Sequence, residues 1–365
     1  MREIGLSEES LFSFLLSKRE EDVDHAHILS SMCTIPHPVA VRAHVQFMET
    51  NLGDPGLFPG TASLERLLVE RLGNLFQLSG ACGYATSGGT ESNIQALRMA
   101  RQLGPKEKPN VIIPESAHFS FKKACDILCL EMRAVPLDEN YRMDPVAAAE
   151  MIDRNTCGIV GIAGTTEYGM VDPIAELSKI AGDHGVFFHV DAAFGGLVLP
   201  FLDDAPAFDF SLPGVSSIAV DPHKMGMSTI PAGVLLVRDS ESLCSLSVDT
   251  PYLTVKQEFT LSGTRPGASV AGALAVLEYL GIQGLRDIVA GCMKNTRRLI
   301  DGMEAYGIMR AATPDVNVAT FSPARIPPPW KVSWTRRGDL RLVCMPHVHA
   351  GAVESFLKDI GEQNA

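Results

Sequence analysis

The sequence lacks the clustered cysteines that mark disulfide-stapled and zinc-binding proteins. Its eight cysteines are scattered and form no Cys-x-x-Cys pair, so we predict neither a disulfide framework nor a structural zinc site. Histidines recur within residues 22–27 and 347–349, but no third ligand follows at a metal-binding spacing. We therefore predict no metal site.

Basic residues and long apolar runs are also scarce. The chain has 31 basic against 43 acidic side chains and a net charge of −12, which disfavours nucleic acids and anionic membranes as partners. No apolar run approaches the roughly 18 residues of a membrane span, and the N-terminal residues include Glu3, Glu8 and Glu9 instead of a signal-peptide pattern. We expect a cytoplasmic protein.

The common phosphate loops are missing, but a different glycine turn is present. Ser87, Gly88, Gly89 and Thr90 precede a helical pattern, without the lysine of a Walker loop or the spacing of a dinucleotide fingerprint. The start of such a helix offers free backbone N–H groups and a positive dipole end, and the two hydroxyls add donors. This turn is typical of a phosphate site.

A lysine and an aspartate at the ends of two apolar segments carry the most information. Lys224 directly follows His223, just beyond the apolar run 217–220, and Asp191 ends another run. A lysine amine forms a Schiff base with pyridoxal phosphate, while a carboxylate keeps the cofactor's ring nitrogen protonated. Either residue alone is better explained as a surface lysine or a capping aspartate. Together with the phosphate turn they indicate a cofactor site.

The remaining pattern predicts an α/β protein. With 365 residues, of which 46% are hydrophobic, the chain is long enough for one large and one smaller domain. Continuous apolar strands alternate with helical segments, which favours a mostly parallel sheet covered on both faces. These strands are predicted at 111–113, 158–163, 186–190, 218–220 and 233–237.

Both ends of the chain differ from this central pattern. We predict an amphipathic helix at 7–22, a second helix at 38–51 and a long helix from about Ala271. Strand-like segments at 316–321, 331–334 and 340–344 precede a closing helix from about Ala350. The predicted division is an N-terminal helical arm (1–52), a large cofactor-binding domain (53–265), and a linking helix with a small C-terminal α/β domain (266–365).

The order of phosphate turn, aspartate and His-Lys resembles that of the group II pyridoxal-phosphate-dependent amino acid decarboxylases. Among these it is most similar to the archaeal L-tyrosine/L-aspartate decarboxylases. The likeness continues through segments 33–38, 53–61, 116–123, 164–169, 250–253, 261–267 and 340–347. It implies pyridoxal 5'-phosphate as the cofactor and the aspartate-aminotransferase-like fold, called fold type I among enzymes with this cofactor.

The resemblance also implies roles for single residues around the cofactor ring. Lys224 would carry the cofactor, and Asp191 would hold the protonated ring nitrogen. His118 would stack on one face of the ring and Ala193 would lie under the other; a polar loop histidine explains His118 equally well. Thr165 would bond the ring hydroxyl.

Further implied roles concern the phosphate and the neighbouring subunit. The phosphate ligands would be Ser87, Gly88, Gly89, Thr90 and His223. A loop of Ser262, Gly263 and Thr264 would reach the phosphate from a second copy of the chain, which implies an obligate homodimer. In the alternative this loop is an ordinary inter-domain turn of a monomer.

Two residues would act on the substrate. Arg341 matches the arginine that grips the substrate carboxylate, a task suited to a planar guanidinium, although a solvated arginine at a strand edge is the simpler explanation. Tyr252 matches a tyrosine on the active-site loop and is our candidate general acid.

The implied reaction is α-decarboxylation of an L-amino acid. The substrates would be tyrosine, giving tyramine for methanofuran synthesis, or aspartate, giving β-alanine for coenzyme A synthesis. The sequence leaves this choice open. The alternatives are another lyase with the same cofactor, similar to glutamate decarboxylase or to the phosphorylated-aldehyde lyases, and a non-catalytic protein that binds pyridoxal phosphate.

Overall fold

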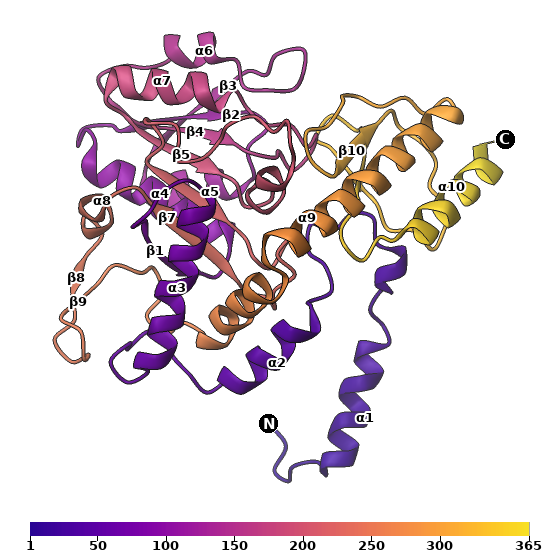
Figure 1. Ribbon diagram of the computed structural model, residues 1–365, viewed down its shortest axis with the longest axis horizontal. Helices are drawn as coiled ribbons and strands as arrows, with labels where there is room; N and C mark the ends of the chain where they lie inside the picture. The colour runs from indigo at the N-terminus through magenta and orange to yellow at the C-terminus, as the bar shows by residue number, and fades with distance from the viewer. Residues whose placement is uncertain (365) are drawn as a thin grey trace.

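The computed structural model describes residues 1–364 and is built around a seven-stranded sheet (Figure 1). The strands follow the order β1-β7-β6-β5-β4-β2-β3, and β7 is the one strand that runs antiparallel to its neighbours. The predicted mostly parallel sheet is therefore confirmed. Its strands are β1 (Cys82–Thr86), β2 (Asn110–Pro114), β3 (Glu131–Val135), β4 (Thr156–Ile162), β5 (Phe187–Asp191), β6 (Ser217–Val220) and β7 (Gly233–Val237).

Helices cover both faces of this sheet because successive strand residues point to opposite faces. Ile159 belongs to a core cluster that contains residues of α3 (Pro59–Leu75), α6 (Pro145–Glu150) and α7 (Ile174–His184). The next residue, Val160, belongs to a second cluster with α4 (Gly89–Leu103), α5 (Ser120–Leu128) and α8 (Ser240–Cys244). Both faces are apolar, which explains why the strands appear as continuous apolar runs.

The strand ends place the candidate residues at one edge of the sheet. β5 and β6 are parallel neighbours, with Asp191 at the end of β5 and Lys224 shortly after β6. α4 begins directly beyond β1, at the predicted phosphate turn. In open α/β sheets, ligands bind outside the carboxyl ends of the strands.

A second, smaller sheet lies towards the C-terminus. Its order is β10-β12-β11, all antiparallel, with β10 (Val318–Phe321), β11 (Ser333–Trp334) and β12 (Leu340–Val343). Its apolar cluster includes residues of α10 (Ala350–Asn364) and, unexpectedly, Leu29 from the N-terminal segment. The N–H of Val343 donates to the carbonyl of Leu29 over 2.7 Å. The N-terminal segment is thus tied to the small sheet, and the division at 52 and 265 stays a prediction.

The long helix α9 (Gly267–Ala305) runs from the large sheet to the small one (Figure 1). It packs against α2 (Pro38–Phe47) and α3. Its length and composition would suffice to cross a membrane, but half of its most apolar window is buried inside the fold, as expected of a core helix.

The N-terminal helix differs from its prediction. α1 (Glu8–Arg19) is a helix, capped by Ser7 and containing no buried residue. Leu11, Phe12, Leu15 and Leu16 are all exposed. They share one side of the helix, but Glu8 and Arg19 lie on that same side, at i, i+4 spacing from Phe12 and Leu15. The expected amphipathic pattern is therefore wrong. The remaining short elements are η1 (His25–His27), η2 (Gly195–Leu197), η3 (Leu199–Phe201), β8 (Val248–Asp249) and β9 (Gln257–Glu258).

The helix α9 is interrupted at Gly281, and a substitution there tests whether the interruption requires glycine. Gly281 has φ 58° and ψ −170° inside the helix, a conformation that is essentially restricted to glycine. We predict that Gly281→Ala lowers the free energy of unfolding by about 1–3 kcal/mol, measured by chemical denaturation.

The matched control is Gly291→Ala, in the same helix. Gly291 is exposed and a Cβ there would meet nothing within 4 Å, so alanine should stabilise the protein by up to about 1 kcal/mol. Equal changes in the free energy of unfolding for Gly281→Ala and Gly291→Ala would contradict the helix break assigned to Gly281.

Candidate active site

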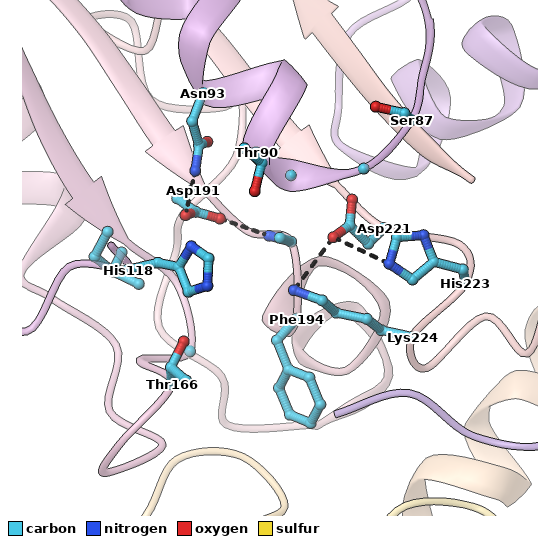
Figure 2. Close-up of a pocket in the computed structure, with 15 residues that line it drawn as sticks. Ser87, Thr90, Asn93, His118, Thr166, Asp191, Phe194, Asp221, His223 and Lys224 are labelled. Carbon is cyan, nitrogen blue, oxygen red and sulfur yellow. Dashed lines mark hydrogen bonds and ion pairs between the residues drawn. The ribbon is translucent and has the colours of Figure 1, made fainter. Parts of the chain in front are cut away.

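A cavity of about 230 Å³ opens at the carboxyl ends of β5 and β6 (Figure 2). It unites most of the residues predicted from the sequence, which come from segments up to 137 positions apart, since Ser87 and Lys224 both line it. The lining residues are Ser87, Gly88, Gly89, Thr90, Asn93, His118, Ile162, Gly164, Thr166, Asp191, Ala193, Phe194, Asp221, His223 and Lys224.

The glycine turn at the start of α4 has no room for side chains. Gly88 has φ +136°, and a Cβ there would lie 3.0 Å from Cε1 of His223. A Cβ on Gly89 would lie 3.0 Å from Cβ of Ala193. No side-chain hydrogen bond caps α4 within residues 1–364. The bare helix end therefore faces the cavity as a cradle for an anionic group.

Lys224 is held by a carboxylate that the sequence analysis did not single out. Its Nζ lies 3.2 Å from Oδ2 of Asp221, and Nε2 of His223 lies 3.6 Å from the same oxygen. Asp221 is buried, and its Oδ1 has no hydrogen-bond partner in the described part of the chain. Burial lowers the pKa of His223, although the charge of Asp221 opposes the shift.

Asp191 ends a chain of buried hydrogen bonds. It accepts from Nδ2 of Asn93 over 2.9 Å and from the N–H of Ala193 over 3.0 Å. Oδ1 of Asn93 lies 2.9 Å from Nε2 of His189, whose Nδ1 lies 2.8 Å from the hydroxyl of Ser217. Burial lowers the pKa of His189 to about 4, so its ring is neutral at pH 7. Because Asn93 donates to the aspartate, Nε2 must donate and Nδ1 accept.

His118 and a threonine form the side of the cavity away from His223 (Figure 2). Burial lowers the pKa of His118, and its Nδ1 accepts the N–H of Ser120 over 3.3 Å. The threonine is Thr166, not the predicted Thr165. Thr165 is fully buried and does not line the cavity, and its hydroxyl accepts the N–H of Met170 over 2.9 Å.

Arg341 lies behind this wall and is not the solvated strand-edge arginine of the simpler explanation. Its side chain is buried and donates to the carbonyl of Thr166, which lines the cavity. Its Nη1 donates to the carbonyl of Ser30 over 3.0 Å and to Oγ of Ser333 over 2.9 Å. Its Nη2 is buried without a partner among residues 1–364. Burial lowers the pKa of Arg341 to about 10, opposed by Glu167.

The other predicted residues lie outside the cavity of their own chain. Tyr252 is 86% exposed. Ser262, Gly263 and Thr264 are also exposed. Gly263 packs beside Gly53, where a Cβ would lie 1.9 Å from the carbonyl oxygen of Gly263. None of these four residues lines the cavity, so their predicted roles stay predictions.

Comparison with known sequences gives one consistent result. The family model described as "Pyridoxal-dependent decarboxylase conserved domain" matches residues 49–317. A Methanoregula boonei protein named probable L-tyrosine/L-aspartate decarboxylase is 68% identical, and the match covers 99% of both chains. An Archaeoglobus fulgidus protein named probable L-aspartate decarboxylase is 49% identical, and the match covers 94% of this chain and 96% of the relative.

Solved structures agree on the fold. Sphingosine-1-phosphate lyase from Burkholderia pseudomallei is 27% identical with a TM-score of 0.90, covering 99% of this chain and 91% of the lyase. Glutamate decarboxylase from Lactobacillus brevis is 20% identical with a TM-score of 0.91, covering 100% and 93%. The predicted fold type I architecture is confirmed.

The cavity suits pyridoxal phosphate chemically. It offers a bare helix end for a phosphate, a lysine amine for an aldehyde and a buried carboxylate for a cationic ring nitrogen. A larger residue at Gly89 would collide with Ala193, so the turn and the ring site are packed together. From the matched family model, the near-complete overlap with its relatives and this fit, we conclude that the chain belongs to the family of pyridoxal-dependent decarboxylases.

Proposed function

We propose that this protein removes the α-carboxylate of L-tyrosine and L-aspartate as carbon dioxide, giving tyramine and β-alanine. The observation that carries the proposal is the placement of Lys224 and Asp191 in one cavity, in a chain 68% identical to a relative named for both substrates. Pyridoxal phosphate, when bound, supplies an electron sink for the bond that breaks.

The chain's own residues would divide the work of binding. Lys224 would hold the cofactor covalently, and Asp191 would face the ring nitrogen. Burial lowers the pKa values of His118 and His223, so these rings would pack beside the cofactor without adding positive charge that competes with its ring nitrogen for Asp191. The helix end at Gly89 would receive the phosphate.

Arg341 would receive the substrate carboxylate. Its free Nη2 and its bond to the cavity-lining residue Thr166 support this role. Decarboxylation requires the carboxylate to stand perpendicular to the cofactor ring. The Arg341 guanidinium is bound through Nε and Nη1, so Nη2 is left to donate to the carboxylate and hold it in one direction. A second donor for the side-chain carboxylate of aspartate does not stand out in the cavity wall.

We also propose a cytoplasmic homodimer in which each copy completes the other's site. Tyr252 and the loop 262–264 are exposed, and the apolar side chains of α1 are without cover in a single copy. A partner would bring Tyr252 to the substrate carbon as general acid and the loop 262–264 to the phosphate. In this proposal tyramine feeds methanofuran synthesis and β-alanine feeds coenzyme A synthesis.

The first test measures carbon dioxide and amine release from tyrosine and aspartate side by side. The purified, cofactor-loaded protein should release tyramine from one and β-alanine from the other, and Lys224→Ala should release neither. Carbon dioxide from one substrate alone would narrow the proposal to that substrate. No carbon dioxide from either would contradict it.

A second prediction concerns Arg341. We expect Arg341→Lys to lower kcat/KM by about 10–100-fold, because lysine keeps the charge but loses the fork that binds Thr166 and the carboxylate together. The loss should lie mainly in KM. The absorbance of the bound cofactor should be unchanged, and loss of that absorbance would show that Arg341 serves the cofactor instead.

A third prediction tests the sharing of Tyr252 between copies. Tyr252→Phe should slow carbon dioxide release and divert turnover to oxidative deamination or transamination. Mixing it with Lys224→Ala should restore part of the normal decarboxylation, because each mixed dimer has one of its two sites with both residues intact. Dimers of Tyr252→Phe alone are the control. Mixtures without any recovery would show that Tyr252 acts in its own chain or not at all.

A further inference from the structure

The loop 165–171, which follows β4 and contains the cavity residue Thr166, is bound by the small-sheet region along most of its length. Its backbone and side-chain groups bond to residues of segments 315–320 and 339–341. Arg341 donates to the carbonyl of Thr166, and the Thr320 hydroxyl donates to the carbonyl of Glu167. The Tyr168 hydroxyl donates to Asp339 over 2.9 Å. Asp315 bonds twice, because its N–H donates to the carbonyl of Gly169 over 2.9 Å and its carboxylate accepts the N–H of Val171 over 2.8 Å. The small-sheet region therefore helps to fix the position of the loop.

One arginine of the small sheet extends this grip to a second wall of the cavity. Arg336 lies in the turn between β11 and β12, and its Nε donates to Oε1 of Glu167 over 3.0 Å. Its Nη1 donates to the carbonyl of Glu115, and its Nη2 lies 3.3 Å from the carbonyl of Ala117. Those carbonyls lie three residues and one residue before His118, which lines the cavity. A single guanidinium thus joins the small sheet, the Thr166 loop and the His118 segment.

The turn that presents Arg336 is tightly constrained. The N–H of Thr335 donates to the carbonyl of Asp339, and the Thr335 hydroxyl oxygen accepts the N–H groups of Arg337 and Asp339 over 3.2 and 3.1 Å. Gly338 supplies the left-handed residue of the turn, with φ +87°. The backbone of Arg336 is therefore fixed before its side chain crosses to the large sheet.

We propose that Arg336 is a positioning residue, which holds the His118 segment and the Thr166 loop at a fixed separation across the cavity. This inference rests on the proposed function, because His118 and Thr166 matter only if the cavity binds the cofactor and substrate. Arg336 does not line the cavity. It acts through the carboxylate of Glu167 and the carbonyls of Glu115 and Ala117. Each of the three acceptors is bound by a different nitrogen of the planar guanidinium. The single ammonium nitrogen of lysine would have to reach all three, so we do not expect lysine to replace it.

The size of the effect follows from the exposure of the pair. The Arg336 side chain is 51% exposed and that of Glu167 16%, so solvent screens the ion pair. The two bonds to the carbonyls of Glu115 and Ala117 would therefore fix the position of this segment more than they add to the free energy of unfolding. We expect Arg336→Ala to leave the fold intact while loosening the His118 segment, where the N–H of Ala117 donates to the carbonyl of Pro114.

The experiment compares Arg336→Ala and Arg336→Lys with Arg337→Ala as the matched control. Arg337 lies in the same turn, carries the same charge and stacks over Tyr141 at 5.4 Å, and it has no bond to Glu115 or Ala117. In Arg336→Ala, amide exchange at residues 115–118 should speed up about tenfold, and kcat should fall about 3–10-fold with KM changed less than about twofold. Arg336→Lys should resemble alanine in exchange.

The visible circular dichroism of the bound cofactor is the third measurement. Pyridoxal phosphate is achiral, so this signal reports its chiral surroundings, which would include His118, and should shrink in both Arg336 variants but not in Arg337→Ala. Unchanged exchange and unchanged circular dichroism in Arg336→Ala would overturn the proposal, as would equal effects in Arg337→Ala. Neither measurement needs turnover, so a wild-type protein that fails to decarboxylate either substrate would refute the proposed function separately.

Discussion

The site depends on the burial of the Asp191 carboxylate beneath the first turns of α4. An ionised carboxylate placed in a protein interior costs several kcal/mol unless donors surround it. Asn93 of α4 and the backbone of Ala193 supply those donors. Because Asn93 is itself oriented by His189 and Ser217, the same bonds that make the aspartate tolerable also fix α4 against β5 and β6. The phosphate turn at the start of α4 is placed by this contact.

The charges of the cavity do not by themselves favour a bound phosphate. The lining residues include Asp191 and Asp221 against Lys224, while the pKa values of both lining histidines are lowered by burial. The cavity wall is thus net negative, although the proposed cofactor brings a phosphate. The N-terminus of α4 offsets only about 0.3–1 kcal/mol per charge, or up to about 2 when partly buried. Further donors to the phosphate fit a neighbouring copy, to which the exposed loop 262–264 would belong.

The sequence predicted residues whose position follows from strand ends, and it failed where position depends on packing between distant segments. Asp191 and Lys224 could be placed because apolar strands stop at or shortly before them and parallel neighbours end at one edge. The resemblance implied a role for Thr165 at the cofactor, whereas Thr166 lines the cavity, because a loop has no alternating pattern that says which side chain faces the cavity. Bonds such as Asn93 to Asp191, which spans 98 positions, leave no periodic signal. The exposure of α1 was missed for a similar reason, since composition does not say what covers a helix.

The cavity walls are attached to two different sheets, which would hold different parts of the reacting complex. Lys224, Asp191 and the α4 turn are attached to the large sheet, and these are the groups that would hold the cofactor. Thr166 is attached to the small sheet through the bonds of loop 165–171, and Arg341 lies on that sheet. A small shift of one sheet against the other would therefore move the carboxylate site relative to a stationary cofactor. Since bond cleavage depends on the angle between carboxylate and ring, the contact between the two sheets would set the geometry of the proposed reaction.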